Sequence, residues 1–409
     1  MPAADVIVVG GGPAGAAAAI CLARAGCDVA VFDKAVFPRD KCCGDGLTTG
    51  ALRRLDRLGL RPDAVASWHP ANDVWIRSPS GRAIRFPLPA TGGVFAATAR
   101  RRDLDAALLD TARMAGAKVH DGHAVTGARQ VDGGAAVEVD VAGVGAVLAR
   151  YVLAADGVWS PLRKAFGAWE EAGYLGEWHA FRQYFEGVRP AAGDHLWVWF
   201  EPDLLPGYAW SFPLGAGRAN VGFGIRRAHG RPTREMKQQW DELLARPHIR
   251  RVLGEAAAPE GPHRAWPIPA RIGHTTLSAA GGRVLFAGDA ARATDSMTGE
   301  GIGQALETGE LAADAIVAGG PLDPAVAAAR YRQALRNGLV ADDRLASSLS
   351  RVLESSRRTR GAIRVAGSTG WSRRNFVRWM FEDYPRAIAL TPRRWHRGAL
   401  HGAGAFIPR

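Results

Sequence analysis

The pattern of hydrophobic and polar positions begins with a compact unit. Residues 5–10 and 28–33 are short apolar runs that predict buried strands. Between them, an alanine-rich stretch from about Pro13 to Ala25 predicts a helix. A strand, a glycine turn, a helix and a second strand in this order predict a βαβ unit with parallel strands.

Later segments extend this pattern and then interrupt it. A helix is predicted from about Asp103 to Ala115, and buried runs at 152–157 and 283–289 predict strands of the same parallel sheet. A helix from about Glu300 to Ala318 follows the last run. Residues 170–225 instead predict an antiparallel sheet, because short aromatic strands recur at 195–200, 208–213 and 220–225.

We therefore predict an α/β fold with three parts. A discontinuous Rossmann-type nucleotide-binding domain with a parallel sheet is interleaved with a substrate domain built mostly from an antiparallel sheet, and a helical region follows. The predicted boundaries assign residues 1–70, 100–169 and 275–322 to the first domain, 71–99 and 170–274 to the second, and 323–409 to the helical region.

Composition indicates a globular protein that is neither secreted nor membrane-spanning. The 409 residues are 47% hydrophobic and 22% charged. The four cysteines have no metal-binding spacing, and the neighbours Cys42 and Cys43 would form a disulfide only with strain, so we expect a reducing cytoplasm. No leader precedes the first strand, and the apolar stretch from Ala14 to Ala23 is too short to span a bilayer.

The formal charge of +12 is concentrated near the C-terminus. Residues 351–409 hold 13 arginines and only three acidic residues. Interleaved aromatic residues favour peripheral contact with an anionic membrane surface, or an acidic partner. The alternative is a solvated helical cap in an arginine-rich chain. No nucleic-acid-binding module accompanies the charge, so we expect no nucleic-acid partner. The aromatic residues are Trp371, Phe376, Trp379, Phe381, Tyr384 and Trp395.

A glycine motif lies between the first strand and the first helix. Its bare backbone can approach a pyrophosphate at the positive end of the helix, and Asp33 at the end of the second strand can accept hydrogen bonds from a ribose. These features predict dinucleotide binding without distinguishing FAD from NAD. The expected contacts in the motif are Gly10, Gly12, Pro13, Ala14 and Gly15.

A second pair of loops favours a flavin. A buried strand leads to Gly288 and Asp289, and the segment 298–303, Thr-Gly-Glu-Gly-Ile-Gly, opens a helix. Asp289 can bind ribityl hydroxyls, and the helix end can face the pyrimidine edge of an isoalloxazine ring. A Gly-Asp pair after a strand and glycines at a helix start are each common. Finding the two one after the other along the chain is much less common. We predict FAD, with further contacts from Gly299, Gly301 and Ile302.

A third motif lies at Val152–Arg163, where a buried strand ends in Asp156-Gly157. Together with the two glycine motifs, it makes the chain resemble flavoproteins of the p-hydroxybenzoate hydroxylase-like fold. The resemblance implies that Asp156 and Gly157 lie near the dinucleotide and that Arg101, which opens Arg-x-x-Leu-Asp, contacts FAD. The alternative for Arg101 is one of three surface arginines.

The segment Phe37–Gly44, Phe-Pro-Arg-Asp-Lys-Cys-Cys-Gly, resembles a motif of the geranylgeranyl reductase family, with Cys43 as the matching cysteine. A second matching signature begins at Tyr208. The resemblance spans roughly residues 5–320 and implies FAD-dependent reduction of isoprenoid double bonds on prenyl diphosphates, prenyl lipids or prenylated quinones. Additional FAD contacts are predicted at Lys34, Arg39, Cys43 and Gly44.

The aromatic strands independently favour an apolar substrate. With a period of two, Tyr208, Trp210 and Phe212 share one strand face, and Trp197 and Trp199 share another that we expect nearby. We predict that these five residues bind a hydrophobic small molecule, with Gly222 clearing space for it. The alternative is that the aromatic residues form sheet core.

Reduction of an isolated alkene needs a hydride on one carbon and a proton on the other. Reduced flavin supplies the hydride, and we predict that Cys43 delivers or positions the proton, because a thiol in apolar surroundings stays protonated. Tyr208 and water are the alternative donors, and a purely packing role is the alternative for the thiol. Asp45 and Lys41 are expected to orient the loop.

Some features leave the reaction open. Asp295-Ser296-Met297 replaces a proline-containing family segment, which predicts a looser loop beside the flavin. An FAD-dependent monooxygenase of an aromatic or polyketide-like compound is the alternative function, a halogenase is a more distant one, and a non-catalytic prenyl-lipid carrier is a third. The electron donor is expected to be NAD(P)H, although no second GxGxxG is present and ferredoxin or a deazaflavin could serve.

Overall fold

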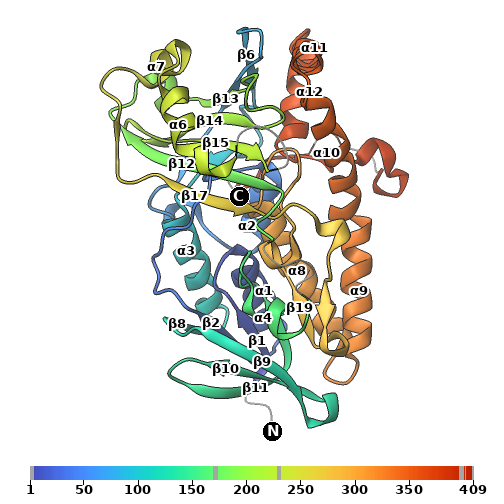
Figure 1. Cartoon of the computed structure of the whole chain (residues 1–409). Coiled ribbons are helices and arrows are strands. Elements are labelled where there is room, and N and C mark those ends of the chain that lie inside the picture. The colour runs from blue at the N-terminus through green and yellow to red at the C-terminus, as the bar shows by residue number, and fades with distance from the viewer. Residues whose placement is uncertain (1–3, 169–173, 228–231, 396–399, 401, 408–409) are drawn as a thin grey trace.

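The computed structural model describes residues 4–168, 174–227, 232–395, 400 and 402–407. Residues 170–173 of the predicted antiparallel region and 396–399 of the basic region lie outside these ranges. Figure 1 shows two large sheets one above the other, with a column of C-terminal helices along one side.

The first sheet contains the predicted parallel strands. Side by side, β19, β11, β1, β2 and β8 are all parallel, and β18, β10 and β9 extend the sheet with antiparallel pairings. The runs predicted at 5–10, 28–33, 152–157 and 283–289 all lie in this one parallel arrangement, as expected, and the first pairs directly with the third. The bounds are β1 Ala4–Val9, β2 Val29–Asp33, β8 Lys118–Asp121, β9 Val125–Val131, β10 Ala136–Val141, β11 Gly145–Ala154, β18 Ser278–Ala279 and β19 Val284–Phe286.

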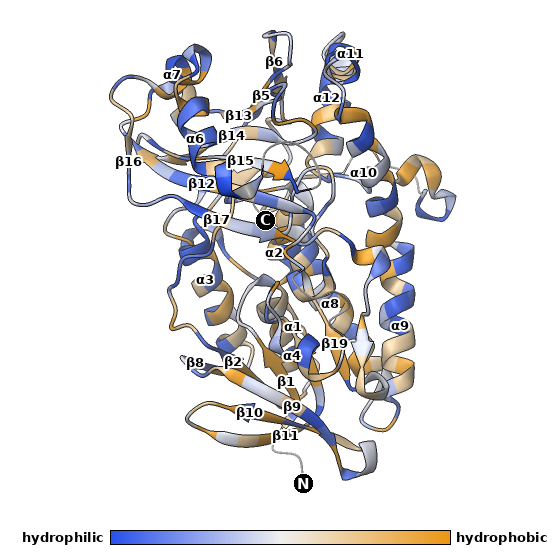
Figure 2. Cartoon of the chain, in the orientation of Figure 1, coloured by the Kyte–Doolittle hydropathy of each residue, from blue (hydrophilic) through white to orange (hydrophobic). Residues whose placement is uncertain are grey.

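Three helices cover this sheet: α1 (Pro13–Arg24), α3 (Arg101–Met114) and α8 (Ile302–Gly319). The alanine-rich face of α1 lets α8 approach closely, because a Cβ added at Gly309 would lie 2.2 Å from the carbonyl oxygen of Ala14. Small side chains therefore join the two helices almost backbone to backbone. Figure 2 shows the apolar residues concentrated along the buried strands of this layer.

The second sheet is mostly antiparallel, as predicted. Its strand order is β16-β12-β15-β14-β13-β5-β6, with β17 also paired to β12, and only the β13–β5 pair is parallel. Helices α6 (Met236–Leu244) and α7 (Pro247–Leu253) cover its outer face. The strands are β5 Asp73–Arg77, β6 Ala83–Pro87, β12 Trp178–Glu186, β13 Leu196–Trp199, β14 Tyr208–Gly215, β15 Arg218–Arg226, β16 Ala258–Pro259 and β17 Arg264–Ile268.

Short elements join the two layers, and the C-terminal region is helical, as predicted. None of the described helices is both long enough and apolar enough to cross a bilayer. The joining elements are β3 Gly46–Leu47, α2 Thr49–Arg57, β4 His69–Pro70 and β7 Ala97–Thr98. Helix α4 (Pro161–Ala165) packs on the first sheet, and α5 (Pro190–Gly193) packs on the second. The C-terminal helices are α9 Pro324–Asn337, α10 Leu339–Leu353, α11 Ser356–Ala366 and α12 Gly370–Met380.

Candidate flavin site

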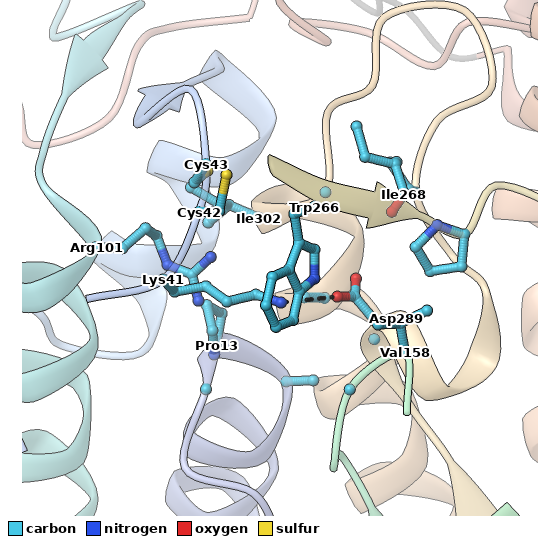
Figure 3. A pocket seen from close by; sticks show the side chains of 18 of the residues that line it. Pro13, Lys41, Cys42, Cys43, Arg101, Val158, Trp266, Ile268, Asp289 and Ile302 are labelled. Atoms are coloured by element: carbon cyan, nitrogen blue, oxygen red, sulfur yellow. Dashed lines mark hydrogen bonds and ion pairs between the residues drawn. The ribbon is translucent and has the colours of Figure 1, made fainter. Parts of the chain in front are cut away.

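A cavity of about 550 Å³ lies between the two sheets. The glycine turn after β1, the loop of residues 39–46, strand β14, strand β17 and the start of α8 all contribute to its wall. Figure 3 shows labelled residues of the glycine turn, the 39–46 loop, β17 and the start of α8 around one space. The cavity therefore joins the predicted nucleotide motifs to the predicted aromatic face.

The glycine turn packs too closely for side chains at two positions. A Cβ at Gly10 (φ +103°) would lie 2.2 Å from the carbonyl oxygen of Ala155, and a Cβ at Gly15 would lie 1.8 Å from the carbonyl oxygen of Gly10. At Gly12 there is instead open space that ends at two guanidinium groups. Pro13 and Ala14, which begin α1, also line the cavity. The turn thus presents bare backbone and a helix N-terminus, which suits a pyrophosphate.

Two arginines face this turn. The nearest guanidinium nitrogens of Arg39 and Arg101 lie 3.6 and 4.0 Å from a Cβ placed on Gly12. Both arginines share the buried carboxylate of Asp105, Arg39 at 3.0 Å and Arg101 through two hydrogen bonds of 2.7 and 2.8 Å. Burial opposes the charge of Arg101, but Asp105 more than offsets it and raises the arginine pKa. One uncompensated positive charge remains beside the helix end, and we propose that it holds the pyrophosphate.

The end of β2 forms another part of the wall. The carboxylate of Asp33 accepts the N–H of Gly11 at 2.7 Å and the N–H of Ala35 at 2.8 Å, one on each oxygen. Each oxygen retains a lone pair for another donor. Lys34 also lines the cavity here. These contacts fix the carboxylate, and we propose that it takes the ribose hydroxyls.

One buried carboxylate oxygen of Asp156 accepts no hydrogen bond from the described residues. Its Oδ2 accepts the N–H of Leu162 at 3.2 Å, whereas Oδ1 has no hydrogen-bond partner among the described residues. Burial raises the Asp156 pKa to about 6. Gly157 follows in the left-handed region, with φ +82°. A buried oxygen without a donor is uncommon, so these residues fit a bound cofactor that supplies one.

Asp289 faces the same cavity from the other sequence motif. The ammonium of Lys41 lies 3.5 Å from its Oδ2 and 4.1 Å from the centre of the Trp266 ring. Gly288, at φ +59°, brings this loop against α1, since a Cβ there would lie 3.0 Å from the Cβ of Ala14. Asp289 therefore lies in the wall of the same cavity as Asp156 and the 298–302 segment.

The loop at residues 295–300 is tightly held, which corrects the expectation of a looser segment. Oδ1 of Asp295 accepts the N–H groups of Met297 (3.0 Å) and Thr298 (2.7 Å) and the Thr298 hydroxyl (2.8 Å). The N–H of Gly299 donates to the Asp295 carbonyl at 3.0 Å. The aspartate thus replaces the rigidity that a proline would supply.

The same loop is clamped by the C-terminal segment. Nε of Arg386 lies 2.7 Å from Oδ2 of Asp295, and its Nη2 donates to the Thr298 hydroxyl at 3.2 Å. Arg386 is only 3% exposed. Glu382 accepts the Thr48 hydroxyl at 2.9 Å and the Gln304 amide at 2.6 Å. Sequence patterns had marked this region by its positive charge, its aromatic residues and its helical periodicity, and nothing local in them indicated these contacts.

The start of α8 is capped from within the loop. Oε1 of Glu300 accepts the N–H groups of Ile302 at 3.1 Å and Gly303 at 3.2 Å. Gly299 (φ +71°), Gly301 and Ile302 line the cavity with it. The predicted flavin-facing helix end is therefore at the cavity, but it carries a carboxyl group of its own.

Both cysteines of the loop at residues 39–46 line the cavity. Sγ of Cys43 accepts the N–H of Asp45 at 3.4 Å, and its carbonyl accepts the Asn220 amide at 2.8 Å. Burial raises the Cys43 pKa to about 11, so the thiol is protonated at neutral pH. Asp45 accepts the Tyr184 hydroxyl at 2.7 Å, and so anchors the loop as expected.

The aromatic face of β14 forms the opposite wall. Tyr208, Trp210 and Phe212 all line the cavity. The Tyr208 hydroxyl donates to the carbonyl of Thr298, and the Trp210 indole donates to Asn220 at 3.0 Å. The Phe212 ring packs against the loop at residues 39–46, since a Cβ on Gly44 would lie 3.5 Å from it, in ordinary van der Waals contact. The three rings therefore form one apolar surface beside the cysteine loop.

Trp197 and Trp199, predicted as substrate contacts, face away from the cavity. In the β13–β14 ladder, Trp197 pairs with Ser211 and Trp199 with Ala209, and directly paired residues share a sheet face. Ser211 and Ala209 alternate with the cavity-facing aromatic residues, so the tryptophans point to the outer face. There Trp199 is 1% exposed and packs with α6 and α7.

Gly222 makes room for protein, not for ligand. It pairs with Trp210, and a Cβ on it would lie 2.4 Å from the indole ring. Its role in the cavity is therefore indirect, through the position of that ring. Sequence patterns also missed Trp266 and Ile268 of β17, although the period of two in β17 could have placed both on one face.

Comparisons with known sequences support the assignment of this cavity as an FAD site. Residues 3–312 match the family described as the FAD binding domain. A menaquinone reductase of Mycolicibacterium smegmatis is 37% identical over 336 residues, 78% of each chain. A digeranylgeranylglycerophospholipid reductase of Methanopyrus kandleri is 33% identical over 334 residues, covering 76% of this chain and 80% of that one.

Solved structures share the fold. A geranylgeranyl bacteriochlorophyll reductase-like protein of Thermoplasma acidophilum has a TM-score of 0.78 at 21% identity, covering 96% of this chain and 99% of that one. A mutant of the halogenase PltM in complex with FAD has a TM-score of 0.72 at 20% identity, covering 93% and 83%.

The fold, the glycine motif and the sequence matches together define the protein as an FAD-dependent oxidoreductase. When bound, FAD supplies hydride chemistry at this site. More specifically, the chain belongs to the geranylgeranyl reductase family of FAD-dependent oxidoreductases.

Proposed function

We propose that the protein reduces isoprenoid carbon–carbon double bonds of a prenyl lipid, a prenylated quinone or a prenyl diphosphate. One observation carries the proposal: a protonated thiol, Cys43, and the apolar wall of Tyr208, Trp210 and Phe212 line the same cavity as the dinucleotide-binding turn. The names of the relatives, a menaquinone reductase and a digeranylgeranylglycerophospholipid reductase, support the same substrate class.

The chemistry requires an acid opposite a hydride donor. An isolated alkene accepts hydride only as positive charge develops at the neighbouring carbon, so a proton must arrive there. The Cys43 thiol is the proposed donor, and Tyr208, whose hydroxyl is held by Thr298, is the alternative. The aromatic wall excludes water from the reacting bond. Arg39, Arg101, Asp33 and Asp289 are proposed to hold the cofactor at the other side.

Anaerobic turnover tests the proposal. The purified protein with FAD, a reductant and menaquinone is expected to yield a product heavier by two hydrogens, measured by mass spectrometry. Geranylgeranyl diphosphate in a parallel reaction distinguishes a free prenyl diphosphate from a prenylated quinone. Product that forms only with oxygen, and is heavier by one oxygen atom, would support the monooxygenase alternative instead. NADPH, NADH and dithionite as separate reductants test the predicted nicotinamide donor.

We further propose that the C-terminal helices dock on an anionic membrane surface, where a prenyl substrate would reside. Arg378 and Arg394 are already paired with Asp383 and Asp342. Exposed cations remain on and around α11, with the exposed side chains of Val365 and Trp371 among them. This mixture suits a lipid headgroup layer. The exposed arginines are Arg351, Arg357, Arg358, Arg360, Arg364, Arg374 and Arg393.

Replacing four of these arginines by glutamine is expected to weaken vesicle binding strongly, because each basic residue contributes about 1 kcal/mol near an anionic surface. The variant removes Arg357, Arg358, Arg360 and Arg364, and the measurement is flotation with phosphatidylglycerol vesicles. The control removes the same charge from exposed positions elsewhere, at Arg102, Arg129, Arg250 and Arg251. Equal binding by both variants would contradict a specific docking face.

A further inference from the structure

Two partly buried carboxyl groups lie on either side of Gly303 at the rear of the cavity. Oε1 of Glu300 is 3.2 Å from the Gly303 nitrogen, and a Cβ on Gly303 would lie 3.3 Å from Oε2 of Glu382. Glu300 belongs to the wall of the main cavity, whereas Glu382 comes from the C-terminal segment. The glycine thus separates a cavity-facing carboxyl group from a second one behind it.

The rear carboxyl group reaches a second cavity. This cavity, about 260 Å³, lies among α2, α8, α10 and the C-terminal segment, and Glu382 and Gln304 are in its wall. Its lining is dominated by charged side chains, including Arg54 and Asp342, so its surface is hydrated more readily than the aromatic wall of the main cavity. Water on this side does not have to pass a prenyl chain in the main cavity.

We propose that Glu300 supplies protons to the main cavity and is recharged from the second cavity through Glu382. This inference rests on the proposed reduction. Each reduced double bond consumes one proton inside the main cavity, and an apolar substrate in that cavity would block the access of bulk water. Glu300 is thereby assigned as a proton-holding residue that neither the family match nor the sequence patterns indicated.

The charges around Glu300 favour its protonated form. Burial, Glu382 and Asp295 raise its pKa to about 8, while the N–H groups at the start of α8 lower it less. Arg386 is committed to Asp295 and Glu382. Across the cavity, the pKa values of Cys43 and Tyr208 are each raised further by the Glu300 charge, so both groups lie within its electrostatic reach.

The proton balance closes with one turnover. When bound and reduced by a nicotinamide donor, FAD would supply a hydride, and with it both electrons, to one alkene carbon. The other carbon takes the proton of the Cys43 thiol, leaving a thiolate. Glu300 returns a proton to that thiolate and becomes a carboxylate, and Glu382 then passes it a proton from water in the second cavity. The net change is one hydride and one proton added to C=C.

The test uses the full-length holoenzyme with Glu300→Gln and Glu382→Gln. The control is Glu310→Gln, because Glu310 is a partly buried glutamate on α8 that lines neither cavity and whose partner Arg54 retains Glu307. The enzyme is supplied anaerobically with excess dithionite and menaquinone, and the steady-state rate over many turnovers is followed by mass spectrometry of the reduced product, because Glu300 acts only after Cys43 has given up its proton. We expect the two test variants to be at least tenfold slower, with FAD affinity unchanged within twofold in all three. Wild-type rates in the test variants would overturn the proposal.

Two readouts separate this proposal from the reduction itself. Infrared spectra of the holoenzyme at neutral pH should contain the carbonyl band of a protonated carboxyl group that Glu300→Gln removes, whether or not menaquinone reacts. The wild-type steady-state rate should fall as pH rises through about 8, where Glu300 loses its proton, and Glu300→Gln should lack that step. Absence of the band would overturn the proposal, whereas a band without menaquinone reduction would overturn only the proposed function.

Discussion

Replacing Cys43 by alanine is expected to lower the rate of double-bond reduction about 100-fold or more, since loss of a positioned general acid has this magnitude. FAD binding should persist, because the hydrogen bonds that anchor the loop run through Asp45, Asn220 and the Cys43 carbonyl, which the variant keeps. Single-turnover reoxidation of prereduced enzyme by menaquinone measures the effect.

The neighbouring thiol offers a matched control. Cys42 lines the same cavity, but its Sγ donates to the carbonyl of Arg264 at 3.6 Å, and its pKa is also raised, to about 12. Cys42→Ala therefore removes an equally buried thiol at the adjacent position and is expected to change the rate less than threefold. Equal losses in both variants would assign the cysteines to packing and leave Tyr208 as the donor.

Replacing Gly15 by alanine is expected to abolish FAD binding and to lower the free energy of unfolding by about 3 kcal/mol, as overpacking does. The added Cβ would lie 1.8 Å from the carbonyl oxygen of Gly10 and 3.1 Å from Val8, so α1 must move away from the turn. Flavin fluorescence titration and urea denaturation measure the two effects.

Gly361→Ala is the control for this substitution. Gly361 lies within α11 and has open space around its Cβ position. The same chemical change should therefore raise the free energy of unfolding by about 0.5 to 1 kcal/mol, as removal of a helix glycine does, and leave FAD binding intact. A Gly15→Ala protein that binds FAD normally would contradict the close packing of the turn.

Local patterns predicted most of the fold. The first strand, helix and second strand were predicted within one residue of their observed bounds, because a buried apolar run and an alanine-rich stretch are continuous signals. The aromatic strand from Tyr208 was predicted with the correct face, since the period of two is also local. The turns at Asp156-Gly157 and Gly288-Asp289 were found in the same way, because each follows a buried apolar run.

The errors arose where a contact depends on the partner strand or on a distant segment. Period alone put Trp197 and Trp199 on one face, but only the register against β14 decides which face that is. Likewise, Arg386 and the exposed Arg358 look alike in sequence. Their difference arises from Asp295, 91 residues before Arg386, which no local pattern connects to it.

The clamp of Arg386 and Glu382 on the 295–300 loop also bears on biosynthesis. A chain still on the ribosome can complete every strand of both sheets, the last of which ends at Phe286, before these two residues have been made. Until then Asp295 lacks its guanidinium and Gln304 lacks its acceptor. A prematurely terminated chain therefore leaves the flavin pocket unfinished, so cofactor retention distinguishes complete translation products from nearly complete ones.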